Sequence, residues 1–161
     1  MNIIRYINQS MRHGELQNDN NFIVSNIFRM NDRDLNRDPS DIKVFNGLHN
    51  HFMLWHGTKN SNIMGILNKG LKIKPPGAVH CASLFGDAIY FSDTFTKALN
   101  YSSLTNNGWA EKKPKFFYVL LCEVALGNIA NYSYNWSDEV YRPPQGYQSV
   151  RIMSKYGPDF N

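Results

Sequence analysis

The stretch from Leu54 to Tyr101, LWHGTKNSNIMGILNKGLKIKPPGAVHCASLFGDAIYFSDTFTKALNY, decides the fold. The apolar run at 51–55 predicts a strand that continues into His-Gly-Thr at 56–58. A shorter apolar run predicts a second strand over 88–91. Polar and glycine-rich segments separate these strands, and two helices are expected within those segments.

Two helices are indicated by their capping residues. Asn60 or Ser61 can cap the start of the first helix, and Gly70 suits the left-handed residue at its end. Asp93 can cap the second helix, which is expected to run to about Tyr101. The buried face of the first helix is predicted to consist of Ile63, Met64, Ile66 and Leu67.

Strand-like segments dominate the flanks of this stretch. The run at 116–126, FFYVLLCEVAL, predicts a central strand buried on both faces and ended by Gly127 and Asn128. Within it Glu123 is interpreted as a buried, hydrogen-bonded structural group, with a catalytic base as the alternative. Shorter elements are expected as a helix over 3–11, a strand over 22–30, a loop over 31–40, a turn or helix over 43–48 and a strand over 149–153, with irregular chain otherwise after Asn131. Because no regular βαβ alternation occurs, the sequence favours an α+β fold with antiparallel sheet.

Length and composition indicate one folded intracellular domain. The chain has 161 residues, with 42% apolar and 19% charged residues, which is too apolar for a disordered protein. No apolar stretch approaches the roughly 20 residues of a membrane span, and 1–10 lacks a signal peptide's apolar core. Two cysteines, Cys81 and Cys122, are too few for a disulfide framework and suggest a reducing compartment. The net charge of +4 leaves nucleic acid open as a weak partner and gives no reason to expect a membrane partner.

Several common catalytic and cofactor motifs are absent. The sequence contains no G-x-G-x-x-G, P-loop, C-x-x-C, H-E-x-x-H or G-x-S-x-G pattern. His80 and Cys81 are adjacent, which is poor geometry for two ligands of one metal, so no metal site is predicted. His13, His49 and His51 are interpreted as surface or packing residues.

An ordered set of short motifs covers nearly the whole chain. The motifs are Leu48-His49-Asn50, Leu54-Trp55-His56-Gly57-Thr58, Gly65-Ile66-Leu67, Gly70-Leu71, Pro75-Pro76, Phe85-Gly86, Ile89-Tyr90-Phe91, Asp93, Lys97, Asn100, Tyr101, CEVALGN at 122–128, and Ser149-Val150 ahead of Gly157-Pro158-Asp159. Each motif is weak alone, but together they resemble the catalytic domain of the poly(ADP-ribose) polymerases, and most closely the DNA-dependent nuclear branch of that family.

The resemblance implies a fold and a domain organisation. It implies an ADP-ribosyltransferase-like fold of mixed, mostly antiparallel sheets with short helices, in a single domain over 1–161. Within it, 1–47 would be the N-terminal part, 48–128 the NAD-binding core and 129–161 an irregular C-terminal segment. The chain ends at Asn161, before the strands that carry the family's catalytic glutamate, so a C-terminally truncated domain is expected.

The resemblance also implies an NAD+ site without a Rossmann motif. His56 would hydrogen-bond the adenosine ribose, and the backbone of Gly57 would hold the nicotinamide carboxamide. Tyr101 would stack on the nicotinamide ring, and Tyr90 would form the opposite wall. Lys97 would lie near the catalytic centre, so that His56, Tyr90 and Lys97 form the expected catalytic set. Further NAD+ contacts are expected from Thr58, Asn62, Lys72 and Phe91.

The same residues also allow structural interpretations. Taken singly, His56 fits a polar turn, Tyr90 and Tyr101 fit a core, and Lys97 fits a solvated helix face. The chain also departs from the family pattern, with Ala98 where a carboxamide-binding serine is usual, Ser83 in place of a pocket tyrosine, and Lys72 in place of an arginine.

Three functions follow from these residues. The first is transfer of ADP-ribose from NAD+ to an acceptor, most simply a protein, with release of nicotinamide, in an intracellular setting for which the resemblance favours the nucleus over the cytoplasm. The second is an inactive module that binds NAD+ or ADP-ribose. The third is a basic interaction protein with a decayed pocket.

Overall fold

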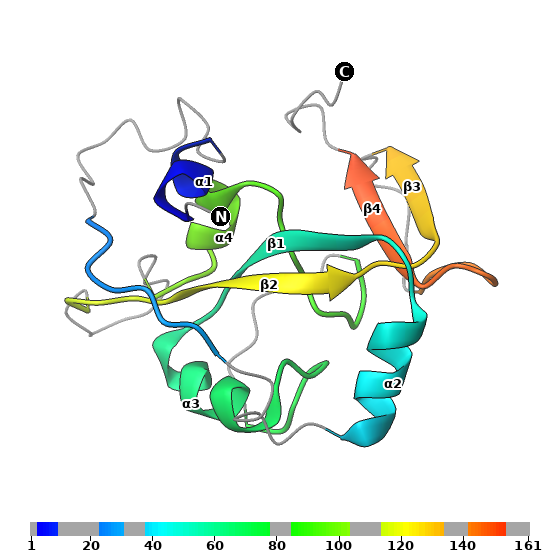
Figure 1. The fold of residues 1–161 in the computed structure, drawn as a ribbon, viewed down its shortest axis with the longest axis horizontal. Helices are drawn as coiled ribbons and strands as arrows, with labels where there is room; N and C mark the ends of the chain where they lie inside the picture. Colours follow the sequence, from blue (N-terminus) through cyan, green and yellow to red (C-terminus); the bar gives the residue numbers. More distant parts are fainter. Residues whose placement is uncertain are drawn as a thin grey trace.

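Small sheets and short helices are combined in the computed structural model of the chain (Figure 1). It describes residues 3–9, 23–30, 38–77, 85–103, 114–133 and 142–153. The helices in these ranges are α1 (Ile3–Gln9), α2 (Pro39–Gly47), α3 (Asn60–Lys69) and α4 (Phe95–Leu99), and the strands are β1 (His51–Gly57), β2 (Val119–Ala125), β3 (Ile129–Ser133) and β4 (Ser149–Met153). The predicted α+β class is confirmed.

Predictions for some residues lie outside the described ranges. They concern the end of the first helix at Met11, His13, the loop over 31–37, His80, Cys81, Ser83, and the Gly157-Pro158-Asp159 motif. Among the residues that the structure describes, no helix is long and apolar enough to cross a membrane.

The antiparallel pair β1–β2 forms the long ribbon at the centre of Figure 1. His51 lies opposite Ala125 at one end, and Gly57 lies opposite Val119 at the other. This agrees with the strand predicted over 51–55 and its continuation to Gly57. The prediction of a central strand over 116–126, buried on both faces, is wrong. Among the described strands β2 pairs only with β1, so it has one open edge. Its residues are half-buried, except for one that is exposed.

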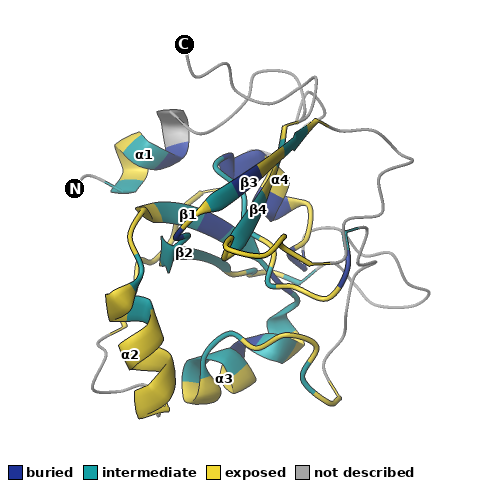
Figure 2. Cartoon of the chain, turned by 90° about the vertical axis from the view of Figure 1, so that its right-hand side faces the viewer, coloured by how far each residue is buried: buried dark blue, intermediate teal, exposed yellow. Residues whose placement is uncertain are grey.

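The hydrophobic core cluster lies where β1 meets α4 (Figure 2). Trp55 is 3% exposed and forms the centre of this core. Its ring stacks on Tyr6 at 5.6 Å and meets Phe95 edge-on at 5.1 Å. The Tyr6 hydroxyl donates to the Met53 carbonyl at 2.8 Å, which docks α1 on the ribbon. Aromatic pairs of this kind add stability beyond the area they bury.

The strand predicted over 88–91 is wrong, because the other edge of β1 carries only an isolated bridge to Ser92 among the described residues. Ser92 exchanges backbone hydrogen bonds with Trp55, at 2.7 and 2.8 Å, and no longer pairing follows among the described residues. The Tyr90 hydroxyl explains this difference. It donates to the Gly86 carbonyl at 2.7 Å and accepts from the Phe85 amide at 3.1 Å, so it closes 85–90 into a loop.

The first residues of α3 and α4 differ from those predicted. The residue before α3 is Lys59 and the residue before α4 is Thr94, and neither caps its helix with a side-chain hydrogen bond. Neither Asn60, Ser61 nor Asp93 acts as the predicted cap. Instead, the Asn60 amide donates to the Ser103 hydroxyl at 2.7 Å. A distant side chain thus satisfies one of the amides that every helix start leaves unpaired.

The face and the end of α3 follow the prediction only in part. Ile63 is buried and Ile66 and Leu67 are half-buried, but Met64 is 75% exposed, so its assignment to the buried face is wrong. Gly70 ends the helix with φ +75°, as its position predicts, and its amide donates to the Ile66 carbonyl at 2.8 Å. Only glycine adopts such a conformation without strain.

The helix α2 starts earlier than the predicted 43–48. Its first residue is Pro39, which suits the first turn because proline lacks an amide proton. The Asp38 carboxylate accepts from the Ser40 amide at 2.8 Å and caps the helix. The last residues of the predicted loop over 31–40 therefore belong to α2 and its cap.

Two strand predictions outside the central ribbon have different outcomes. The predicted strand over 22–30 is wrong for the described part, because 23–30 is exposed throughout and pairs with no described strand. The predicted strand over 149–153 is confirmed as β4. It pairs in parallel with β3, from Ile129 opposite Ser149 to Ser133 opposite Met153, where irregular chain is expected after Asn131. The fold therefore contains one antiparallel and one parallel pair among its described strands.

Candidate functional site

The end of β1 lies directly against α4. A Cβ atom added at Gly57 would overlap the Ala98 carbonyl oxygen and would stand 3.1 Å from the Cβ of Tyr101. Only a glycine permits so close an approach of two backbones. The structure therefore brings together Gly57, Ala98 and Tyr101, whose positions are 41 and 44 residues apart from Gly57 in the sequence.

The neighbouring residue His56 is held by the loop that precedes α4. Its Nδ1 lies 2.8 Å from the Tyr90 carbonyl oxygen, and its ring lies 5.6 Å from the Phe91 ring at a tilt of 57°. A carbonyl only accepts, so Nδ1 carries the proton. Burial lowers the pKa of His56, against the opposing effect of the Tyr90 hydrogen bond. The neutral ring then presents the lone pair of Nε2 as a hydrogen-bond acceptor.

The two tyrosines keep part of their rings accessible. Tyr90 is 40% and Tyr101 is 46% exposed. The Tyr90 hydroxyl proton is used by the Gly86 carbonyl, so the ring face is what Tyr90 can offer to a ligand. The Tyr101 amide donates to the Ala98 carbonyl at 3.0 Å, which fixes the backbone of Tyr101 beside Gly57.

Thr58 and Asn62 bind each other at the start of α3. The Asn62 side-chain amide donates to the Thr58 hydroxyl at 3.1 Å, and Thr58 is buried. This pair orients the chain between His56-Gly57 and α3.

The two predicted lysines occupy different surroundings. Lys97 lies exposed on α4, next to Ala98. Lys72 is exposed and lies near Asp38 at the start of α2. Hydrogen bonds from Ser40 hold the pKa of Asp38 below its ordinary value, and the charge of Lys72 adds to this effect. Lys72 is therefore placed toward α2, and Lys97 beside the contact between α4 and Gly57.

Glu123 is not the buried group that its apolar strand predicts. Its carboxylate is 58% exposed and lies 3.0 Å from Nδ1 of His51 on the neighbouring strand. His51 also meets the Phe45 ring edge-on, at 4.8 Å between centroids, which confirms its interpretation as a surface and packing residue. The burial expected for Glu123 is wrong because its partner strand covers only an edge of β2.

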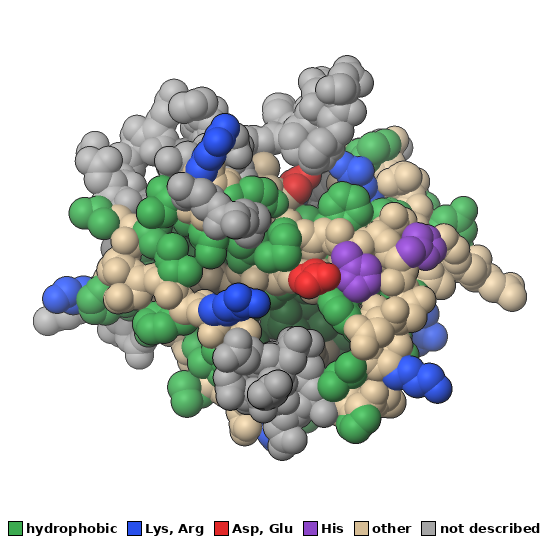
Figure 3. All heavy atoms as spheres, viewed as in Figure 1, with side chains coloured by type: hydrophobic (Ala, Val, Ile, Leu, Met, Phe, Trp, Pro, Cys, Tyr) green, Lys and Arg blue, Asp and Glu red, His purple; other side chains and the backbone are tan. Residues whose placement is uncertain are grey.

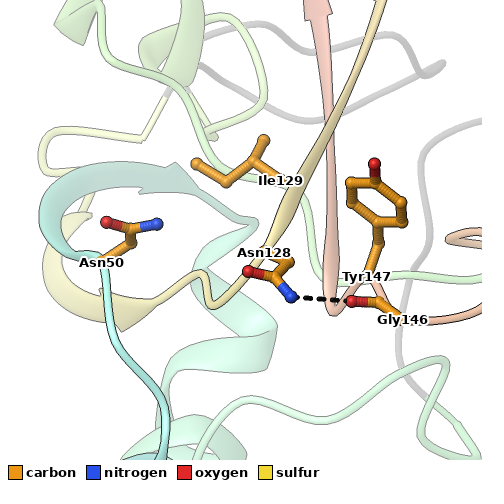
Figure 4. Close-up of a pocket in the computed structure, with 5 residues that line it drawn as sticks. All are labelled: Asn50, Asn128, Ile129, Gly146 and Tyr147. Carbon is orange, nitrogen blue, oxygen red and sulfur yellow. Dashed lines mark hydrogen bonds between the residues drawn. The ribbon is translucent and has the colours of Figure 1, made fainter.

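A hollow of about 540 Å3 lies at the opposite end of β1 (Figure 4). It is lined by Asn50, Asn128, Ile129, Gly146 and Tyr147. The Asn128 side-chain amide donates across it to the Gly146 carbonyl at 2.9 Å. No residue predicted to bind NAD+ lines it, and the sequence carries no signal for it because its residues come from three separate segments. Among the described residues, no group of three potential metal ligands occurs.

Comparison with known proteins identifies the family. The poly(ADP-ribose) polymerase catalytic domain matches residues 1–161. Poly(ADP-ribose) polymerase 1 of Xenopus laevis is 33% identical over 91% of this chain and 14% of its own length. The same-named protein of Gallus gallus is 38% identical over 73% of this chain and 11% of its own length, and that of Danio rerio is 29% identical over 98% and 14%.

This chain belongs to the poly(ADP-ribose) polymerase catalytic-domain family. The resemblance stated from the sequence is thereby confirmed, and the family is one of NAD+-dependent ADP-ribosyltransferases. The chain spans between a tenth and a sixth of the length of these relatives. In this polymerase-family domain the structure unites His56 with Tyr90 and Phe91, and Gly57 with Tyr101. The roles of these residues toward NAD+ stay predictions.

Proposed function

We propose that this chain binds NAD+ along the end of β1 and transfers ADP-ribose to an acceptor protein with release of nicotinamide. The observation that carries the proposal is the contact of Gly57 with the Ala98 carbonyl and Tyr101. Three residues that the family motif assigns to the nicotinamide end of the ligand meet at one place. We also propose that the chain acts inside the cell and, because its motifs resemble those of the nuclear branch of the family, in the nucleus.

The chemistry of the nicotinamide end suits these groups. The Gly57 backbone, unobstructed by a side chain, can offer both a donor and an acceptor to a carboxamide. The half-exposed ring of Tyr101 provides a flat apolar surface on which an aromatic ring can stack. Ala98 lacks the hydroxyl of the usual serine, so one hydrogen bond, worth about 0.5–1.5 kcal/mol, is missing from this end.

The adenosine ribose, toward the other end of the ligand, requires a different partner. A ribose hydroxyl can donate a hydrogen bond, and the neutral ring of His56 presents an accepting Nε2. Because His56 and Gly57 are consecutive in β1, the two ends of the ligand would be held by one rigid strand. Rigid positioning matters because cleavage of the bond to nicotinamide builds positive charge on the ribose that carried it, as in glycoside chemistry.

The described carboxylates favour a second candidate, a module that binds NAD+ or ADP-ribose without turnover. Three of the five described carboxylates are engaged elsewhere: Asp38 caps α2, Asp87 pairs with Lys74, and Glu123 bonds His51. A carboxylate near the ribose would stabilise the cationic transition state. A pocket that lacks one would bind the ligand but turn it over slowly.

One experiment separates these candidates. The 161-residue chain is incubated with labelled NAD+, and both nicotinamide release and label on protein are followed, with His56→Ala as control. Turnover that disappears in His56→Ala supports the transferase. Calorimetric binding of NAD+ without turnover supports the binding module. Absence of both binding and turnover overturns the proposal.

A further inference from the structure

The two residues that follow Tyr101 are held by the residues that precede and begin α3. The Lys59 ammonium donates to the Ser102 carbonyl at 2.8 Å, and the backbone amide of Asn60 donates to the Ser103 hydroxyl at 2.7 Å. Ser102 is fully buried and Ser103 nearly so, at 8% exposure. Hydrogen bonds between buried or half-buried groups are shielded from competition by water.

These bonds connect the two segments that form the site. Lys59 and Asn60 come two and three residues after Gly57, while Ser102 and Ser103 come one and two residues after Tyr101. The Ser102 hydroxyl also donates to the Leu99 carbonyl at 2.7 Å, which closes the turn after α4. Tyr101 is therefore fixed on one side by its own bond to Ala98 and on the other by the bonds to the α3 segment.

We propose that Lys59 and Ser103 are positioning residues that hold Tyr101 opposite Gly57. The proposal rests on the proposed function, since it deepens the account of the nicotinamide end. Neither side chain needs to touch the ligand. Each acts through the backbone, because a shift of the turn at 102–103 moves Tyr101 relative to Gly57, where an added Cβ would lie 3.1 Å from the Cβ of Tyr101.

The effect should be confined to one half of the ligand. His56 is held separately, by the Tyr90 carbonyl and beside the Phe91 ring. Loosening the turn after Tyr101 leaves those contacts in place. NAD+ should therefore lose affinity, while ADP-ribose, which lacks nicotinamide, should not.

The binding experiment compares Ser103→Ala with the wild-type chain by calorimetry. Loss of one hydrogen bond predicts NAD+ binding weakened about 2- to 10-fold, with ADP-ribose affinity unchanged. The matched control is Ser61→Ala, an exposed serine in the first turn of α3. Thermal unfolding of each variant confirms that it is folded at the temperature of the measurement.

A second pair of variants tests the other bond. Lys59→Met removes the donor to Ser102 and should weaken NAD+ binding selectively, while Lys59→Arg retains a donor and should restore it. Lys69→Met, at an exposed position in the last turn of α3, is the matched control. The proposal is overturned if Ser103→Ala and Lys59→Met lose NAD+ and ADP-ribose affinity equally, or if neither of these two variants loses NAD+ affinity.

An NMR measurement tests the positioning without a ligand. A nuclear Overhauser effect between the Gly57 α protons and the Tyr101 β protons is expected in the wild-type chain, and it should weaken in Ser103→Ala. An unchanged signal in the variant overturns the positioning role. If the wild-type chain binds no NAD+, the proposed function fails, while this signal still decides whether Ser103 positions Tyr101.

Discussion

The two ends of β1 carry the same residue type in opposite electrostatic settings. At its start, His51 has Nδ1 at 3.0 Å from a Glu123 carboxylate oxygen and Nε2 at 2.9 Å from the Leu48 carbonyl oxygen. Both partners only accept, so both ring nitrogens donate when the ring is protonated. The hydrogen bonds to Leu48 and then Glu123 raise the pKa of His51. The Glu123 carboxylate is 58% exposed, and Figure 3 shows an acidic side chain beside a histidine on this face of the molecule.

At the other end of the strand, burial favours the neutral form of His56. Its single described hydrogen bond, to the Tyr90 carbonyl, uses one ring nitrogen. The difference shows that the pKa of each histidine is set by the partners that other segments supply, more than by its position on the strand. His51 fastens the end of α2 to the ribbon, while His56 keeps an acceptor available beside Gly57.

The largest effect is expected from a change that removes the close contact of β1 with α4 at the His56 end. Gly57→Ala would place a Cβ on the Ala98 carbonyl, so we expect a loss of about 1–3 kcal/mol in the free energy of unfolding. NAD+ binding should fall below detection. Chemical denaturation and calorimetry measure the two effects.

Gly65→Ala provides the control for this change. A Cβ at Gly65, within α3, meets nothing within 4 Å, so alanine should stabilise the helix by about 0.5–1 kcal/mol. Wild-type stability and affinity in Gly57→Ala would contradict the close approach of β1 and α4.

A second effect distinguishes the two histidines directly. His56→Ala should weaken NAD+ binding by about 0.5–1.5 kcal/mol, the value of one hydrogen bond. His51→Ala, on the same strand, should leave the affinity unchanged because its ring bonds Glu123 and Leu48. Calorimetry on both variants measures the contrast, and equal losses would remove the distinction between the two ends.

A third, smaller effect strengthens the His56 end. Ala98→Ser restores the serine usual in the family, at a residue whose backbone contacts Gly57, and should tighten binding of nicotinamide-like ligands by up to about tenfold. Competition between such a ligand and NAD+ measures the change. An unchanged affinity would mean that residue 98 does not face the nicotinamide end.

The smallest effect is the pH dependence of stability. The raised pKa of His51 contributes stability below pH 6.5 that is lost as the pH rises through its folded-state pKa. The lowered pKa of His56 contributes stability above pH 6.5 that is lost as the pH falls through its folded-state pKa. Titration of the ring C2 protons by NMR should give pKa values on opposite sides of 6.5.

Glu123→Gln tests the cause of that difference. Without the carboxylate, the pKa of His51 should fall toward 6.5 while that of His56 stays unchanged. A pKa of His51 that does not move would assign its shift to the Leu48 carbonyl alone.

Local patterns in the sequence were sufficient for several elements. Strand β1, the helix α1, the glycine end of α3 and the strand β4 follow from periodicity and from glycine's conformational freedom, which depend on neighbouring residues alone. The motif residues also indicated the family correctly, because their order along the chain is a property of sequence.

Tertiary contacts decided the elements that the sequence did not predict. The start of α3 is completed by Ser103, 43 residues away, and no pattern around Asn60 contains that information. The strand β3 exists through its parallel partner β4, and 23–30 lacks such a partner among the described strands.

The candidate site divides in the same way. The sequence by itself determined which residue types are present: a histidine, a glycine without a side chain, and two tyrosines. Only the tertiary structure placed Tyr101 against Gly57 and the Tyr90 carbonyl against His56. The physical reason is that hydrogen bonds and close backbone contacts depend on distances in space, and these follow from chain segments that the fold brings together.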